Sequence, residues 1–354
     1  MPGVESRMPE ASMIGLSRSS PARVIRRFAI VSIRSDQSGV EGTVTGCGMV
    51  VDDRHMQSVL YVFPLADGGS MSDRRRRCVI DHNSRRAVNH STQDLSPIAQ
   101  LPMYDWPEVR SATNTLWRSI AMAFARHRFA APKVLDRSIP VAKVWRSPNL
   151  LLAQTCGLPY VRHLRDTVRV LGAMAYDLPG CRAGDYHSVL VVHQAAGISE
   201  LKACRGVRVA INSEDSYSGC LALDRQIAAF CEGPFFGERI PTGSHRQSIR
   251  AVARGIADLA AIDCVTWALA CKHEPATERV RVIGTTNSRP GLPLITSRLR
   301  SDADCEALQT ALEEAVAQLE KRSRDALRLL AFVRKKETDY DCIVADEQRV
   351  AQSL

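Results

Sequence analysis

From residue 97 onward, short runs of apolar residues alternate with longer segments in which apolar residues recur every three or four positions. The short runs are Ile98–Leu101, Leu150–Ala153, Val168–Leu171, Val189–Val192, Val207–Ile211, Leu259–Ile262 and Val280–Ile283. The longer segments include one over 107–124 and one from Cys305 to Leu330, each with an apolar stripe along one side. Because strands that alternate with helices pack as layers, this pattern predicts an α/β fold with mixed, mostly parallel sheets.

Residues 1–95 differ from the rest of the chain. They contain no lysine, carry an arginine run at 74–77, and show only two short apolar pieces, 28–33 and 58–65. A segment with so little apolar surface cannot offset the entropy of ordering, so we expect a poorly structured N-terminal extension. An alternative is that the natural start lies further along, with Met71 as one candidate. For the arginine run, we favour a solvated tail over a nucleic-acid-binding arm.

The chain is basic, with a formal net charge of +9 at pH 7. This charge favours anionic partners without selecting among them. Only 5% of the residues are aromatic and no basic stretch is interleaved with aromatics, so we expect no nucleic-acid binding. No run of about 18 apolar residues occurs, so we expect no membrane insertion. The pair Arg26-Arg27 precedes an apolar segment that stops at Arg34, which is too short for an export signal.

The eleven cysteines are scattered without a Cys-x-x-Cys pair. In a chain of this length they indicate small buried hydrophobic residues in a reducing compartment. Cys264, Cys271 and His273 lie close together in the sequence, but a zinc site requires about four ligands at characteristic spacings. We therefore expect no metal site and no cofactor.

A serine-rich junction joins a predicted strand to a predicted helix near residue 216. The segment 213–219 follows the strand 208–212 and precedes a helix over 220–230. Unpaired N–H groups at a helix start, together with serine hydroxyls, bind a phosphate-sized anion without any lysine. Gly219 would let the backbone and a ligand approach closely. Helix capping alone is the competing interpretation.

A second junction precedes a predicted helix over 246–257. Ser244, followed by Gln247 three residues later, fits a capping box, and His245 stands beside it. The chain then enters a strand that ends in Asp263. Ligands of open α/β sheets lie beyond the carboxyl ends of strands, so this carboxylate is placed to contact one. Capping of the following helix is an equally good account of Asp263, and the two roles are compatible.

Catalytic motifs are absent from the sequence. There is no Gly-x-Ser-x-Gly elbow, no His-Glu-x-x-His and no phosphate-binding Walker loop. Ser244, His245 and Asp263 superficially suggest an acyl-transfer triad, but adjacent residues at a helix start point in different directions. We therefore predict a binding protein rather than an enzyme.

Several segments carry a family likeness. They are Leu101-Pro102-Met103-Tyr104-Asp105, Gln154-Thr155-Cys156-Gly157-Leu158-Pro159-Tyr160, Gly184-Asp185-Tyr186-His187-Ser188, Ser216-Tyr217-Ser218-Gly219, Thr242-Gly243-Ser244-His245-Arg246-Gln247-Ser248, Ala257-Asp258-Leu259-Ala260-Ala261-Ile262-Asp263-Cys264-Val265-Thr266-Trp267 and Pro290-Gly291-Leu292-Pro293. In combination, from about residue 97 to about residue 343, they resemble the phosphate/phosphite/phosphonate substrate-binding proteins of ABC transporters.

The resemblance implies a type II periplasmic-binding-protein fold with two lobes that close on a ligand by hinge motion. One lobe would comprise 97–188 with 284–354, and the other 189–283. The ligand-binding residues implied by the matching motifs are Tyr104, Tyr186, Ser216, Ser218, Gly219, Ser244, His245 and Asp263. Among these, we expect His245 to donate a hydrogen bond and to become charged when an anion is bound.

The resemblance further implies capture of a small phosphorus oxyanion (phosphate, phosphite or phosphonate) in the cleft between the lobes, by a monomer that serves an ABC permease. An enzyme of metabolite processing and a cytosolic ligand sensor are the alternatives on the same fold. The resemblance implies a periplasmic location, while the lack of a recognisable export signal leaves a cytoplasmic one open. If the chain is exported, Cys156 and Cys181 are the pair to test for a disulfide.

Overall fold

The computed structural model describes residues 46–52, 57–63, 96–181 and 183–353. The chain divides into two compact units, 1–88 and 89–354. In the first unit, strands β1 (Gly46–Asp52) and β2 (Gln57–Phe63) pair antiparallel, from Gly46 opposite Phe63 to Asp52 opposite Gln57. This hairpin was not predicted. The rest of residues 1–95, including the arginine run at 74–77, lies outside the described residues. The expectation of a poorly structured extension is therefore not tested there.

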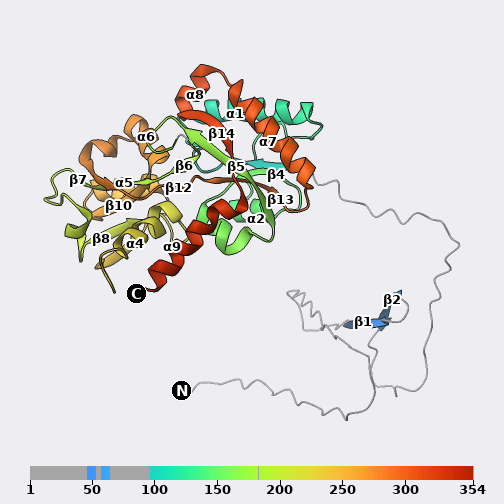
Figure 1. Ribbon diagram of the computed structural model, residues 1–354, viewed down its shortest axis with the longest axis horizontal. Coiled ribbons are helices and arrows are strands. Elements are labelled where there is room, and N and C mark those ends of the chain that lie inside the picture. Colours follow the sequence, from blue (N-terminus) through green and yellow to red (C-terminus); the bar gives the residue numbers. More distant parts are fainter. Residues whose placement is uncertain (1–45, 53–56, 64–95, 182, 354) are drawn as a thin grey trace, which may run out of the picture. The chain divides into compact units, whose positions relative to one another are not determined.

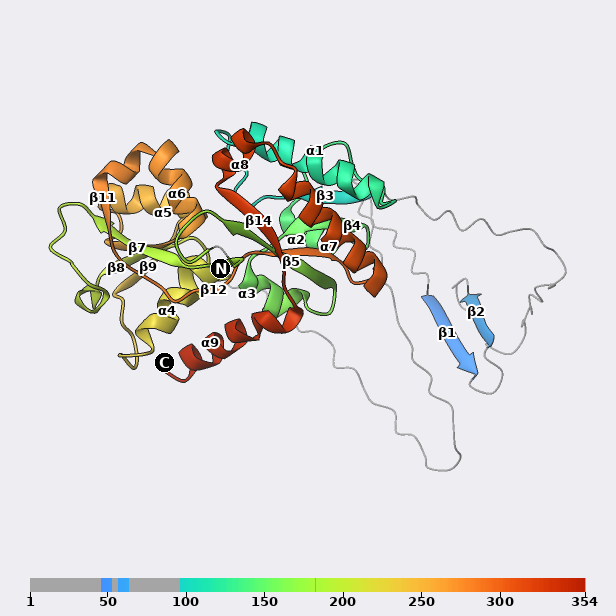
Figure 2. The same ribbon diagram turned by 45° about the horizontal axis from the view of Figure 1, so that its top comes forward.

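The second unit contains two five-stranded sheets with helices packed against them (Figure 1). The first sheet has the strand order β14-β5-β13-β4-β3. Its strands are β3 (Ile98–Gln100), β4 (Leu150–Gln154), β5 (Val168–Tyr176), β13 (Pro293–Ser297) and β14 (Leu329–Arg334). Helices α1 (Arg110–Arg126), α7 (Asp302–Ala317) and α8 (Lys321–Leu327) lie side by side at this sheet (Figures 1 and 2). The connections also contain α2 (Val141–Trp145), α3 (Gly157–Pro159) and η1 (Tyr160–Leu164).

The second sheet has the strand order β11-β7-β10-β8-β9. Its strands are β7 (Ser188–His193), β8 (Arg208–Ile211), β9 (Glu238–Pro241), β10 (Leu259–Asp263) and β11 (Val280–Thr285). Its helices are α4 (Ala222–Ile227), α5 (His245–Ala253) and α6 (Cys264–His273), with the shorter turns η2 (Leu201–Cys204), η3 (Tyr217–Leu221) and η4 (Pro275–Arg279). Two apolar clusters, one on each side of this sheet, hold alternate residues of its strands, as the pleat requires.

Two chain crossovers connect the sheets and explain the strand directions. The first contains β6 (Asp185–Tyr186) and the second β12 (Arg289–Pro290), and these two short strands pair antiparallel. Strands β7 and β13, which follow the crossovers, run antiparallel to both of their neighbours. Among the strands that the structure describes, parallel pairing is confined to β3 with β4, and to β8 with its neighbours β9 and β10. The mixed α/β class is confirmed, with more antiparallel pairing than the alternation of elements predicted.

The prediction of one helix from Cys305 to Leu330 was wrong. Helix α7 ends at Ala317, α8 covers 321–327, and Leu329 already belongs to β14. Arg328 closes α8 in the left-handed conformation, with φ of 55°. Leu319 lies in the connection between α7 and α8 and is only 4% exposed. The apolar spacing of the sequence therefore continues through a segment where the helix is interrupted.

The C-terminal helix α9 (Asp341–Ala351) follows the turn η5 (Glu337–Tyr340) at the first sheet and reaches α4 of the second (Figure 2). Its Asp346 is buried and accepts hydrogen bonds of 2.7 Å from Tyr217 Oη and from Arg289 Nε and Nη2. The helix therefore ties the start of the η3–α4 segment to the second crossover. None of the helices in the described part of the chain combines the length and apolar character that a membrane span requires.

Candidate functional site

The first serine-rich junction forms a capped helix start at the end of β8. The hydroxyl of Ser216 accepts a hydrogen bond of 3.0 Å from the Gly219 backbone N–H. Ser216 through Gly219 are all buried, and the π-helical turn η3 continues into α4. A buried helix start concentrates partly positive N–H groups at one point, which suits an anion.

The second junction forms the start of α5. The Ser244 hydroxyl accepts a hydrogen bond of 3.2 Å from the Gln247 backbone N–H, so the predicted cap is present. Ser244 itself is exposed, whereas the side chain of the next residue, His245, is only 11% exposed. The cap orients the helix, and the histidine is the residue that it directs inward.

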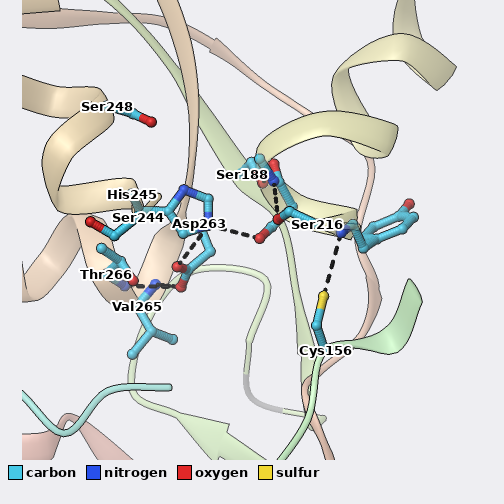
Figure 3. A network of polar contacts seen from close by, with 12 residues as sticks. Cys156, Ser188, Ser216, Ser244, His245, Ser248, Asp263, Val265 and Thr266 are labelled. Carbon is cyan, nitrogen blue, oxygen red and sulfur yellow. Dashed lines mark hydrogen bonds and ion pairs between the residues drawn. The ribbon is translucent and has the colours of Figure 1, made fainter. Parts of the chain in front are cut away.

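Asp263 ends β10 and caps α6. Its Oδ1 atom accepts hydrogen bonds from the backbone N–H groups of Val265 (3.1 Å) and Thr266 (2.9 Å) (Figure 3). The same oxygen accepts a third hydrogen bond, of 2.9 Å, from the hydroxyl of Tyr104, which belongs to the first-sheet side of the molecule. Asp263 therefore links the two halves of the unit while it caps a helix.

The two helix starts meet at His245. Its Nε2 atom lies 2.9 Å from Ser218 Oγ. The same atom lies 3.5 Å from Asp263 Oδ2 (Figure 3). Ser218, His245 and Asp263 come from three different strand-to-helix junctions. In this conformation the polar atoms of the three side chains contact one another. An anion that enters the site must therefore replace some of these contacts.

Burial sets the protonation of this cluster. It lowers the pKa of His245 below its ordinary value of 6.5, although the nearby Asp263 acts in the opposite direction. Burial, reinforced by Asp263, raises the pKa of the Tyr104 hydroxyl well above 10. At neutral pH the cluster therefore holds a neutral imidazole and a protonated phenol, both of which can donate to an anion.

The cluster resembles a catalytic triad in composition but not in geometry. A triad needs the acid on one imidazole nitrogen and the serine on the other. Here the same atom, Nε2, faces both Ser218 and Asp263. The histidine consequently cannot relay a proton from the serine while the carboxylate fixes its tautomer.

Gly219 allows the two junctions to approach. A Cβ atom at this position would overlap Asn212 Oδ1 and would lie 2.9 Å from His245 Cε1. Asn212 follows β8, and its buried Oδ1 has no hydrogen-bond partner among the described residues. The absence of a side chain at Gly219 is therefore required for the close approach of Asn212 and His245 to its backbone. It would also allow a ligand to approach.

Sequence reasoning missed three residues that adjoin the cluster: Asn212, Ser188 and Tyr176. The Ser188 hydroxyl donates a hydrogen bond of 2.8 Å to the Ser218 carbonyl, and the Tyr176 ring packs edge-on against Tyr104 at 5.6 Å between centroids. Asn212 ends one predicted strand and Ser188 directly precedes another, which was the available signal. Tyr176 lies five residues beyond the end predicted for its strand, so no signal marked it.

Tyr186 was expected on the opposite side of the site from the helix starts. It is 3% exposed, and its ring centroid lies 6.3 Å from that of Tyr217. Its hydroxyl is buried without a hydrogen-bond partner among the described residues. An unpaired buried hydroxyl is costly, which makes it a candidate donor to a ligand.

A cavity of about 40 Å³ lies behind Tyr104. Its wall is predominantly apolar and consists of Leu101, Tyr104, Thr113, Leu116, Gln154, Met174, Tyr176, Leu269, Leu294, Leu327 and Leu329. Leu269 comes from α6 of the second sheet, and the remaining lining residues come from the first-sheet side. Tyr104 thus borders both an apolar cavity and the polar cluster.

Comparison with known proteins gives the family. The model of the family described as "ABC transporter, phosphonate, periplasmic substrate-binding protein" matches residues 148–341, more than half of the chain. The chain belongs to this family. The matched range contains every site residue discussed above except Tyr104. Because the family comprises substrate-binding proteins, the prediction of a binding protein rather than an enzyme is confirmed at that level.

Solved structures agree with the fold of this phosphonate-family protein. PhnD1 of Prochlorococcus marinus in complex with methylphosphonate is 17% identical, with a TM-score of 0.56 over 73% of this chain and 99% of that one. XAC2383 of Xanthomonas citri bound to ATP is 16% identical, with a TM-score of 0.55 over 73% and 99%. A binding component of an ABC phosphonate transporter from Pseudomonas aeruginosa is 15% identical, with a TM-score of 0.55 over 73% and 88%. No curated protein sequence matches this chain.

Proposed function

We propose that this protein captures a small phosphorus oxyanion between its two sheets and delivers it to an ABC permease. The observation that carries the proposal is the meeting of two capped helix starts at His245, with Ser218 Oγ at 2.9 Å from its Nε2. Helix N-termini and hydroxyls are suited to oxyanions. In keeping with its family, we also propose that the protein acts in the periplasm as a monomer.

The two lobes of this mechanism would be the two sheets. The predicted division was 97–188 with 284–354 against 189–283, but Ser188 and residues 284–285 lie in strands of the second sheet. Tyr104 and Asp263 then lie on opposite lobes, and their hydrogen bond joins the two. Hinge closure would bring the Tyr104 side against a ligand held at the three junctions of the other lobe. The buried hydroxyl of Tyr186, unpaired among the described residues, supplies one more donor.

The apolar cavity beside Tyr104 favours an oxyanion that carries a small carbon substituent. A phosphonate has such a substituent, whereas phosphate presents only oxygens. A volume of about 40 Å³ is enough for a short alkyl group. We therefore propose that an alkylphosphonate binds more tightly than phosphate.

Isothermal titration with phosphate, phosphite, methylphosphonate, aminoethylphosphonate and ATP tests this proposal. We expect saturable binding without turnover, with methylphosphonate ahead of phosphate. Replacement of His245 by alanine should weaken the binding by about 1.5–3 kcal/mol, the range for hydrogen bonds to charged groups. The exposed His163, replaced in the same way, is the control. An absence of binding across the panel, or equal affinities for both variants, would refute the assignment.

A further inference from the structure

Two cysteine sulfurs face each other at the boundary between the sheets. Cys181 Sγ lies 3.0 Å from Cys264 Sγ, although the residues are 83 positions apart in the chain. Cys181 follows β5 of the first sheet, and Cys264 is the first residue of α6 in the second. Both side chains are buried, at 0% and 6% exposure. Cys156 and Cys181, the pair to test if the chain is exported, are both free in this structure, and Cys156 Sγ accepts a hydrogen bond of 3.4 Å from the Tyr217 N–H.

Backbone hydrogen bonds hold both cysteines in place. The Cys181 N–H donates to the Leu178 carbonyl at 3.1 Å, and the Cys264 N–H donates to the His187 carbonyl at 2.9 Å. A sulfur separation of 3.0 Å exceeds the disulfide bond length of about 2.05 Å by only about an ångström. Formation of the bond therefore requires the two sulfurs to move together by about one ångström.

The surroundings favour a thiolate on Cys181. The hydrogen bond with the Cys264 thiol lowers the pKa of Cys181, and His187 acts in the same direction, while burial opposes both. The thiolate is the form that attacks a disulfide, so Cys181 is the nucleophile of this pair. Because both sulfurs are buried, a reagent reaches them only through local opening of the structure.

We propose that Cys181 and Cys264 form a reversible disulfide that joins the segment after β5 to the start of α6. The Cys181 thiolate attacks a low-molecular-weight disulfide such as oxidised glutathione, forms a mixed disulfide and releases one glutathione thiolate. Cys264 then attacks the Cys181 sulfur and releases the second glutathione. The two protein thiols are oxidised, the reagent disulfide is reduced to two thiols, and the two thiol protons pass to the released sulfurs.

A metal ion is the competing occupant of this site. Cys181, His187 and Cys264 place three donor atoms within 4.8 Å of one another. A closed structural zinc site takes four protein ligands, and a catalytic one keeps an open position for water. No fourth donor converges on the three in the part of the chain that the structure describes, and the two sulfurs are buried. The disulfide is therefore the better account of the pair.

The position of the bond connects it to ligand exchange. Cys264 directly follows Asp263, which accepts the hydrogen bond from Tyr104. A covalent link at Cys264 would hold this end of α6 against the first-sheet side and oppose opening of the lobes. This consequence rests on the proposed function, whereas formation of the bond does not.

The bond is tested on the ligand-free full chain equilibrated with oxidised glutathione. Remaining thiols are alkylated in denaturant, and the digested protein is mapped by mass spectrometry. We expect a cross-link between the peptides that contain residues 181 and 264, with a mass loss of two hydrogen atoms. Cys181→Ser and Cys264→Ser should each abolish it, and Cys305→Ser, a buried cysteine of α7, should not. Full alkylation of both cysteines, a cross-link to Cys156 or Cys271, or retention of stoichiometric zinc by the reduced protein would overturn the proposal.

The consequence for exchange is tested separately, with methylphosphonate as the probe. We expect oxidation to slow its dissociation severalfold from the wild-type protein and to leave Cys264→Ser unchanged. A mapped disulfide with unaltered dissociation would overturn the effect on opening while the bond itself stands. A mapped disulfide in a protein that binds no member of the panel would refute the proposed function alone.

Discussion

The hydroxyl of Tyr104 donates a hydrogen bond of 2.9 Å to Asp263, across 159 positions of sequence. The tyrosine comes from the connection between β3 and α1, and the aspartate from the junction of β10 with α6. This single bond joins the helix caps of one sheet to the wall of the apolar cavity in the other.

Replacement of Tyr104 by phenylalanine should destabilise the protein. Asp263 would keep its bonds to two backbone N–H groups and lose the one across the sheets. The expected loss is about 1.5–3 kcal/mol in the free energy of unfolding, as for other hydrogen bonds to charged groups. Urea denaturation measures it. Tyr160→Phe is the matched control, because the buried Tyr160 hydroxyl has no partner among the described residues. Equal losses in both variants would contradict a role for the bond.

His245 should make stability depend on pH. Burial lowers its pKa in the folded protein, so the unfolded chain binds the extra proton between that lowered pKa and about 6.5. The contribution to stability is therefore complete above about pH 6.5 and is lost as the pH falls below it. We expect the urea midpoint of the wild-type protein to decrease more than that of His245→Gln between about pH 7.5 and 5.5. The exposed His163→Gln serves as control and should follow the wild type. Parallel curves for all three proteins would exclude this linkage.

An alanine at position 219 should disrupt the meeting of the helix starts. Its Cβ would overlap Asn212 Oδ1 and press on the His245 ring. Overpacking of this kind costs about 1–3 kcal/mol. We expect lower thermal stability together with weaker anion binding. Gly197→Ala is the comparison, since no atom lies within 4 Å of a Cβ added there. A Gly219→Ala protein as stable as the Gly197→Ala protein would show that the junctions can separate freely.

Asp346→Asn should destabilise the attachment of α9. The buried carboxylate accepts two bonds from Arg289 and one from Tyr217, and it lies 3.2 Å from Arg225. Removal of one partner from a buried ion pair costs about 3 kcal/mol. The control is Asp325→Asn. Asp325 forms an ion pair with Lys321, and both side chains are more than half exposed. We expect this substitution to change the free energy of unfolding by less than about 1 kcal/mol. Chemical denaturation compares the two, and similar small effects would mean that α9 is held by its other contacts.

The sequence by itself determined the features that depend on neighbours three or four residues away. The apolar runs placed β4, β8 and β10, and the caps at Ser244 and Asp263 were predicted because each closes a hydrogen bond within three residues. Such interactions need no knowledge of the rest of the fold. The same local reasoning failed at 318–320, where buried Leu319 preserved the helical spacing across a break in the backbone.

Only the tertiary structure decided which side chains meet. The sequence placed Ser218, His245 and Asp263 at junctions but could not show that His245 faces Ser218 rather than its neighbour Ser244. That pairing follows from the order of β8, β9 and β10 in the sheet. The contacts of Tyr104 with Asp263 and of Cys181 with Cys264 depend on the two crossovers that set one sheet beside the other. Local periodicity selects strands and helices, while long-range packing of whole layers selects their partners.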